Sequence, residues 1–267
     1  MQNKPDFIVV GAQKAATTSL YNALRQHPDI DGPDHKETHY FSDTKLFAKG
    51  LERYCSLFPE RKTEKTKLGE FTPNYLFDSH ALTNIYNELG GDTKIVVVLR
   101  NPVDRFLSCY KHFSAVGKLF RGDVVNAEMR EKLEPFFDNG WEGESRTLAE
   151  VVSGRDEHWK CEYYAGGRYA LHINKAWDLF GRKNVRVVLF EDLVKKPNNN
   201  VKAIHEFLGV EPKHSKFRIL NTSKKWAAYY DAEVEITPEI KKTLENYYRP
   251  YNNILKEMLK RKLTWNK

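Results

Sequence analysis

The sequence is poor in cysteine, with three among 267 residues, and no two of them form a C-x-x-C pair. Cys55, Cys109 and Cys161 are odd in number and widely spaced, which argues against a disulfide framework or a zinc site. We expect three reduced thiols in a reducing compartment. The sequence also lacks a secretory hydrophobic segment and any apolar run near the ~20 residues that span a bilayer. The expected location is therefore cytoplasmic if the chain is full length.

Neither sign of charge dominates, because the chain has 43 Lys and Arg residues and 36 Asp and Glu residues, which gives a net charge of +7. Such an excess suits an anionic ligand or acceptor but is too small to indicate nucleic acid. Hydrophobic residues make up 40% and charged residues 30%, as in folded globular domains. There is no internal repeat or low-complexity tract, so we expect a single domain over residues 1–267.

Three short apolar runs predict buried parallel strands: "DFIVVG", "TKIVVVLRNP" and "NVRVVLFEDL". Helical spacing is found in "TTSLYNALRQH", "PVDRFLSCYKHF", "NNNVKAIHEFLGV" and "TPEIKKTLENYYRPYNNILKEMLKRK". We expect the third of these helices to end at Gly209 and the fourth to be interrupted at Pro250. The alternation predicts an α/β fold, a parallel β-sheet flanked by helices. Residues 114–144 have weak periodicity and are expected to form a surface insertion, with a lid as the alternative.

The segment "FIVVGAQKAATTSLYNALRQHP" has the outline of a phosphate-binding loop between a strand and a helix. After Gly11 the chain must turn and present backbone N–H groups at a helix N-terminus, which attracts anions. The loop offers small residues, hydroxyl donors and one cation: Ala15, Ala16, Thr17, Thr18, Ser19 and Lys14. The alternative is an ordinary strand-to-helix turn with an exposed lysine.

The loop departs from the nucleoside-triphosphate pattern G-x-x-x-x-G-K-[ST]. Lys14 is followed by Ala15, so the Lys-Ser/Thr pair that couples phosphate to Mg²⁺ is missing. This weighs against a triphosphate hydrolase. Glu191 and Asp192, at the end of the third predicted strand, keep a kinase or NTPase alternative open, although acids there also cap a loop.

A second anion site is indicated after the strand "VVVLR". Arg100 stands at the carboxyl end of that strand, where open parallel sheets bind ligands. Ser108 follows eight residues later in the next predicted helix. A guanidinium and a hydroxyl there are suited to hold a phosphate, with Arg105 as an alternative partner. Arg100 as a surface helix cap is the competing interpretation.

Four motifs follow one another in the chain: "GAQKAATTSLYNALRQHPDI", "HKETHYF", "GEFTPNYL" and "VVVLRNPVDRFLSCYKHF". Together they resemble the sulfotransferases that use 3′-phosphoadenosine-5′-phosphosulfate (PAPS), particularly the heparan-sulfate type and its bacterial relatives. Later segments, including "GGRYALHINKAWDLFGRKNVRVVLFEDL", resemble that branch as well. The resemblance implies a P-loop nucleotide-kinase-like sulfotransferase fold, PAPS as co-substrate, its desulfated product PAP, and no metal.

The resemblance also implies roles for individual residues. The loop from Gln13 through Lys14 to Ser19 would bind the 5′-phosphosulfate, with Lys14 near the bridging oxygen. Arg100 and Ser108 would hold the 3′-phosphate. Glu37 of "HKETHYF" falls at the position of the family's catalytic base. His39 lies two residues on and would share a face with it in an extended segment, as an acceptor-site or catalytic support. A solvated acid beside a hydrogen-bonded histidine is the alternative.

Two departures from the resembling branch bear on the site. Phe71 follows Glu70 where that branch usually has a lysine, so either Lys14 stabilises the transferring group alone or another cation substitutes. Glu70 would orient a loop or touch the acceptor. The stretch "NTSKKWAAYY" is short and has no cysteine. Lys224 and Lys225 are candidates for the 3′-phosphate and Trp226 for adenine, with a plain surface loop as the alternative.

The sequence therefore predicts a sulfotransferase that moves a sulfuryl group from PAPS to an acceptor hydroxyl. A saccharide is the first expectation for the acceptor, and a lipid, polyketide or small metabolite is the second. A P-loop kinase or NTPase and a non-catalytic protein that binds anionic glycans stay open as alternatives. No nucleic-acid partner and no integral membrane segment are expected. If the chain is a trimmed catalytic domain, the resemblance implies the Golgi lumen.

Overall fold

The computed structural model describes residues 3–121, 143–155, 162–220 and 234–265. The chain divides into two compact units, and each is built from two separate stretches of sequence. The first unit comprises Met1–Arg100 and Tyr169–Leu220, and the second comprises Asn101–Arg168 and Asn221–Lys267. The single domain expected from the sequence stays a prediction.

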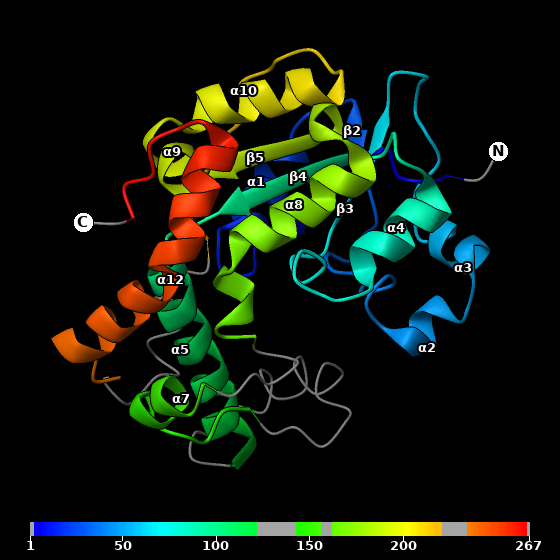
Figure 1. The fold of residues 1–267 in the computed structure, drawn as a ribbon. Helices are drawn as coiled ribbons and strands as arrows, with labels where there is room; N and C mark the ends of the chain where they lie inside the picture. The colour runs from blue at the N-terminus through cyan, green and yellow to red at the C-terminus, as the bar shows by residue number, and fades with distance from the viewer. Residues whose placement is uncertain (1–2, 122–142, 156–161, 221–233, 266–267) are drawn as a thin grey trace. The chain divides into compact units, whose positions relative to one another are not determined.

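The first unit is built on a parallel five-stranded sheet with the strand order β2-β3-β1-β4-β5 (Figure 1). The strands in chain order are β1 (Phe7–Gly11), β2 (Ile30–Asp31), β3 (Lys67–Phe71), β4 (Lys94–Leu99) and β5 (Val185–Leu189). The three apolar runs predicted as strands are β1, β4 and β5, and every residue of β1 is buried. The predicted α/β class with a parallel sheet is confirmed.

Strands β2 and β3 were not predicted, and β3 has a composition unlike a strand, "KLGEF". Gly69 pairs with Phe7 of β1, and a Cβ at Gly69 would lie 2.0 Å from the Phe7 ring. The neighbouring aromatic ring therefore requires a glycine here, although glycine weakens an isolated strand. Strand β2 has only two residues and offers no pattern to read.

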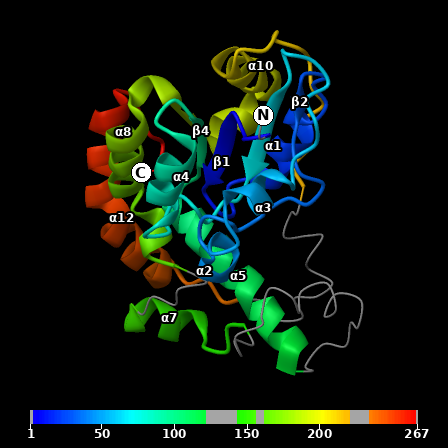
Figure 2. The same cartoon turned by 90° about the vertical axis from the view of Figure 1, so that its right-hand side faces the viewer.

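Helices cover both faces of this sheet. Figure 2 shows α4 (Ala81–Leu89) and α8 (Tyr169–Phe180) on one side, and α1 (Thr17–Leu24) and α10 (Pro197–Leu208) on the other. Helix α10 ends as predicted at Gly209, whose φ of 76° is left-handed. The shorter elements are α2 (Thr44–Phe47), α3 (Leu51–Cys55), the 3₁₀ turn η3 (Arg182–Asn184) and α9 (Phe190–Lys195).

The strand order creates a switch point between β1 and β4. From β1 the chain adds β2 and β3 on one side of it, and then β4 and β5 on the other. At such a point the connections leave neighbouring carboxyl ends in opposite directions and open a crevice for ligands. The loop after Gly11 and the residue Arg100 therefore start from the two strands that flank this switch point.

The second unit is helical where the structure describes it. It contains α5 (Pro102–Arg121), α7 (Leu148–Gly154), the 3₁₀ turn η2 (Ala165–Gly167) and α12 (Pro238–Leu259). Aromatic side chains dominate its core: Phe106, Phe113, Tyr163, Tyr164 and Tyr248. Residues 114–121 extend α5, and the rest of the predicted insertion up to residue 142 lies outside the described residues. No helix within the described ranges is long and apolar enough to cross a bilayer.

The interruption predicted at Pro250 is wrong, because α12 runs through this residue. A proline inside a helix removes one hydrogen bond and costs ~3 kcal/mol or more. The helix buries Leu244, Tyr248, Asn252 and Leu255, which recur every three or four residues on one face. This packing offsets the local cost, and Pro250 itself is exposed.

Candidate active site

The predicted donor loop joins β1 to α1 at the switch point. Lys14 and Ala16 have φ values of 69° and 65°, so both are left-handed. A Cβ at Gly11 would lie 2.6 Å from the Cβ of Leu76, which makes glycine necessary where the loop begins. Ala16 caps α1 with no side-chain hydrogen bond, and the first amides of a helix have no acceptor within it. The loop thus ends in backbone donors at a helix N-terminus.

The side chains of the loop fall into two groups. Ala15, Thr17 and Ser19 are buried, whereas Gln13, Lys14, Ala16 and Thr18 are partly exposed. The Ser19 Oγ accepts the backbone N–H of Leu220 at 2.9 Å, so this hydroxyl holds a distant segment of the chain. The predicted residues Lys224 and Lys225, and Trp226 with them, lie outside the described residues.

Arg100 lies beside the loop. Its Nη1 donates to the carbonyl oxygen of Lys14 at 3.0 Å, and its guanidinium stands over the ring of Phe190, 5.0 Å from the centroid. The structure therefore brings together the loop lysine and the strand-end arginine. Phe190 was missed in the sequence, where the only signal is an aromatic residue at the end of the third apolar run.

The other residues predicted for the 3′-phosphate belong to the second unit. Arg105 is fully buried and donates to the carbonyl oxygens of Glu162 and Tyr163. Its guanidinium is built into the core of that unit, so Arg105 as an alternative phosphate partner is wrong. Ser108 lies half-buried on α5.

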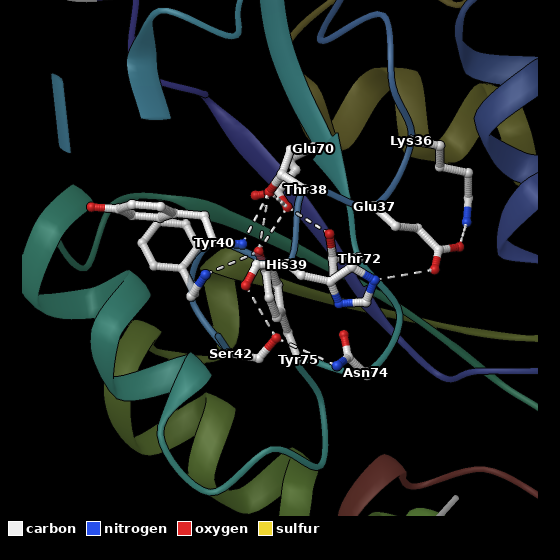
Figure 3. Close-up of polar contacts among 11 residues, drawn as sticks. Lys36, Glu37, Thr38, His39, Tyr40, Ser42, Glu70, Thr72, Asn74 and Tyr75 are labelled. Atoms are coloured by element: carbon white, nitrogen blue, oxygen red, sulfur yellow. Dashed lines mark hydrogen bonds and ion pairs between the residues drawn. The ribbon is translucent and has the colours of Figure 1, made fainter. Parts of the chain in front are cut away.

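Glu37 and His39 lie together, as Figure 3 shows. The Oε2 of Glu37 is 3.8 Å from Nε2 of His39, and its Oε1 contacts Nζ of Lys36. The segment is not extended as expected, because Glu37 and His39 have φ values of 70° and 54°. The two side chains converge through paired left-handed residues instead. Lys36 was missed, although it directly precedes the predicted base.

Strand β3 contains Phe71, the residue that stands where a lysine was expected after Glu70. Phe71 is buried, and its ring makes edge contacts with Phe7 at 5.8 Å and with Tyr21 at 5.0 Å between centroids. Phe71 is therefore part of the core packing, at the position where the resemblance had led us to expect a lysine. Glu70 is also buried, and its carboxylate faces Thr38 in the loop that carries Glu37 (Figure 3).

The second unit contains a cavity of about 780 Å³. It is lined by α5, α7 and the start of α12, and its charged lining includes Lys118, Glu144, Arg146 and Glu239. No predicted site residue within the described part of the chain lines it. The donor loop and the Glu37–His39 pair belong to the first unit.

The chain matches known proteins over nearly its whole length. The family model described as "Sulfotransferase domain" matches residues 4–261, which spans both units. The chain belongs to the sulfotransferase family. The predicted recognition is confirmed, and the fold is the P-loop-like sulfotransferase fold.

The relatives include heparan-sulfate-type enzymes and a bacterial protein. Heparan sulfate glucosamine 3-O-sulfotransferase 3A1 of Mus musculus is 27% identical over 284 residues, which cover 98% of this chain and 64% of that protein. A sulfotransferase structure from Alicyclobacillus acidocaldarius has a TM-score of 0.69 and 28% identity, and 99% of each chain is covered. Mouse sulfotransferase SULT7A1 complexed with PAP shares the fold at a TM-score of 0.55 and 15% identity, with 96% of this chain and 87% of that one covered. The chain spans less than two thirds of the length of the first of these relatives.

Proposed function

We propose that this sulfotransferase takes PAPS as its donor and transfers the sulfuryl group to a saccharide hydroxyl. The observation that carries the proposal is the junction of the Lys14 loop with Arg100 at the switch point of the sheet. A doubly phosphorylated nucleotide needs two anion-binding groups, and this junction supplies a helix N-terminus with a lysine beside an arginine. Ala15 and Ala16 leave room for the donor to approach the backbone.

Each residue has a defined part in the transfer. Glu37 accepts the proton of the acceptor hydroxyl while the oxygen forms its bond to sulfur. The bond between sulfur and the bridging oxygen breaks, and PAP leaves with the negative charge. Lys14 and the amides at the start of α1 stabilise that charge, an electrostatic role. Arg100 and Ser108 hold the 3′-phosphate and orient the donor, and His39 supports the acceptor side.

Two observations favour a saccharide acceptor. The relatives that match nearly the whole chain include heparan sulfate glucosamine 3-O-sulfotransferases, and the net charge of +7 suits an anionic glycan. A lipid, polyketide or small-metabolite hydroxyl is the competing acceptor class. The family match favours sulfuryl transfer over the kinase or NTPase alternative.

The test is transfer of ³⁵S from labelled PAPS to three probes: heparan sulfate, a long-chain fatty alcohol and 4-nitrophenol. Glu37→Gln serves as the inactive control, because it keeps size and hydrogen bonding but removes the basic carboxylate. A base contributes roughly 10²–10⁴-fold to the rate, so the variant should lose transfer. The Glu37 side chain is 35% exposed, so we expect PAP affinity by calorimetry and the melting temperature to stay near wild type.

The outcomes separate the alternatives. Label on heparan sulfate supports the proposal, whereas label only on the fatty alcohol or 4-nitrophenol moves the acceptor to the second class. Full activity in Glu37→Gln would exclude this base. Binding of glycans without transfer to any probe would indicate a non-catalytic protein. If ATP–Mg²⁺ raised the melting temperature more than PAP does, this would favour the kinase or NTPase alternative.

A further inference from the structure

Glu70 is a buried carboxylate close to the proposed base, and four hydroxyls surround it. Its side chain receives hydrogen bonds from Thr38 at 2.5 Å, Tyr54 at 2.5 Å, Thr72 at 2.6 Å and Tyr75 at 2.8 Å. Glu70 is 1% exposed, and no described lysine, arginine or histidine forms an ion pair with it. A buried carboxylate without a cation is costly unless its oxygens are satisfied, so this arrangement requires a reason.

Two of these hydroxyls also bind the backbone of the loop that carries Glu37. A hydroxyl has a single proton, and Thr38 and Tyr75 donate theirs to Glu70. Their oxygens therefore accept, from the N–H of Tyr40 at 3.3 Å and from the N–H of Phe41 at 3.1 Å. Burial and then the charge of Glu70 raise the pKa of Tyr75 well above its usual 10.0, so this phenol remains a donor. One carboxylate thus orients both hydroxyls toward the loop.

The same carboxylate supports the side chains of the loop. Its other oxygen accepts from the hydroxyl of Tyr54, whose pKa is raised well above its usual value first by burial and then by the charge of Glu70. The ring of Tyr40 stacks on the ring of Tyr54, with centroids 4.4 Å apart and planes inclined by 15°. Glu70 therefore supports the loop in two ways: Thr38 and Tyr75 bind the loop backbone, and Tyr54 stacks on the ring of Tyr40.

The loop conformation shows what this support achieves. Glu37 and His39 are both left-handed, and Thr38 stands between them (Figure 3). Residues other than glycine seldom adopt this backbone conformation, and it persists only where the surroundings fix it. Thr38 is the residue of this trio that Glu70 holds.

We infer that Glu70 is a positioning residue: through the hydroxyl of Thr38 it fixes the two left-handed residues that bring Glu37 and His39 together. The inference rests on the proposed function, in which Glu37 is the base. The competing interpretation is that Glu70 only stabilises the fold around β3. Glu70→Gln would place a buried amide among four donors and lose stability under either interpretation, so it does not separate them.

Thr38→Val and Thr72→Val form a matched pair that separates the two interpretations of Glu70. Both remove one hydroxyl from the same Glu70 oxygen, at 2.5 and 2.6 Å, and both preserve side-chain shape. Only Thr38 belongs to the loop. We expect similar losses in melting temperature for the two variants. In ³⁵S transfer from PAPS to heparan sulfate, kcat should fall on the order of 10–100-fold further in Thr38→Val than in Thr72→Val, because misplacement of a reacting group by about 1 Å has that effect.

Two further measurements complete the test. The KM for PAPS should stay near wild type in both variants, and Thr38→Ser should restore kcat, because serine keeps the hydroxyl. The ring ¹H–¹³C signals of His39 should shift in Thr38→Val and stay in place in Thr72→Val. This NMR comparison needs no acceptor, so it decides the inference even if no probe is sulfated and the proposed function fails. Equal effects of the two variants on kcat and on the His39 signals would overturn the inference.

Discussion

At the scale of single residues, a substitution of Lys14 can test the charge of its side chain without changing the contact that its backbone makes. Arg100 binds the carbonyl of Lys14, so Lys14→Ala removes the ammonium group and leaves this contact in place. Alanine also adopts the left-handed φ of 69° at no greater cost than lysine. We expect transfer to fall on the order of 10²–10³-fold, with a much smaller change in PAP affinity. Steady-state rates within a few-fold of wild type would show that Lys14 is not the catalytic cation.

Arg100 has one observed interaction, with the loop at Lys14, and one proposed interaction, with the 3′-phosphate of the donor. Binding of PAP and of 5′-AMP can separate the two. Arg100→Ala removes the hydrogen bond to Lys14 and the group proposed for the 3′-phosphate. Disorder of the loop would weaken PAP and 5′-AMP alike, because both ligands carry the 5′-phosphate. The additional loss for PAP measures the 3′-phosphate contact, and a charged hydrogen bond contributes roughly 1.5–3 kcal/mol. Calorimetry with both ligands checks this, and equal losses would place Arg100 elsewhere in the site.

The sequence predicted part of this site because some residues stand in one motif. Glu37 and His39 are two residues apart, and the resemblance drew attention to them. The hydroxyls around Glu70 are of two kinds. Thr72 and Tyr75 stand beside Glu70 in the motif "GEFTPNYL", whereas Thr38 and Tyr54 come from 32 and 16 residues away. Only the placement of the chain around β3 brings all four hydroxyls to one carboxylate, so the sequence did not predict this cluster.

At the scale of elements, apolar runs predicted strands well and tertiary packing decided the rest. β1, β4 and β5 consist mostly of apolar residues, and β1 is buried throughout, as expected of strands in a covered parallel sheet. β3 was not predicted because it contains Gly69, which the ring of Phe7 requires. Helix α12 continues through Pro250 because its apolar face is buried. In each case a contact from elsewhere in the chain outweighs the local preference of a glycine or a proline.

Helix α10 contains a buried histidine that makes the first unit sensitive to acid. His205 is fully buried, and its ring centroid lies 4.7 Å from that of the buried His27. Nδ1 of His205 accepts the N–H of Lys213 at 3.3 Å, and its Nε2 has no partner among the described residues. Burial, and then His27, lower the pKa of His205 from 6.5 to about 4.

The sign of the pH effect follows from proton binding. Between pH 6.5 and about 4, the unfolded chain binds a proton at His205 and the folded chain does not. The free energy of unfolding therefore falls as the pH drops through this window, by on the order of 2 kcal/mol from about pH 7 to about pH 5. His205→Asn keeps an acceptor for Lys213 and cannot titrate, so urea unfolding should show a smaller loss on acidification. His214→Asn, at an exposed histidine, is the control and should behave as wild type. An unchanged pH dependence in His205→Asn would contradict this account.

At the scale of the whole molecule, the sulfotransferase family model spans both compact units, and each unit is assembled from two separate stretches of chain. Lys14, Arg100 and the Glu37–His39 pair belong to the first unit, whereas Ser108 belongs to the second. A test of the proposed function therefore needs the whole matched length of residues 4–261.

The net charge leads to a prediction about the acceptor. An excess of seven positive charges attracts a polyanionic glycan, and salt screens such attraction over a Debye length of about 10 Å at 0.1 M. With PAP at saturation, the affinity for heparan sulfate should fall at least about tenfold when NaCl rises from about 50 mM to about 300 mM. Calorimetric titration checks this, with dextran as an uncharged glycan control that should bind weakly at every salt concentration. PAP binding should depend less on salt, because its phosphates would lie against Lys14 and Arg100 in a partly buried site. Heparan sulfate binding that does not change with salt, or that only equals binding of dextran, would favour an acceptor from the lipid, polyketide or small-metabolite class.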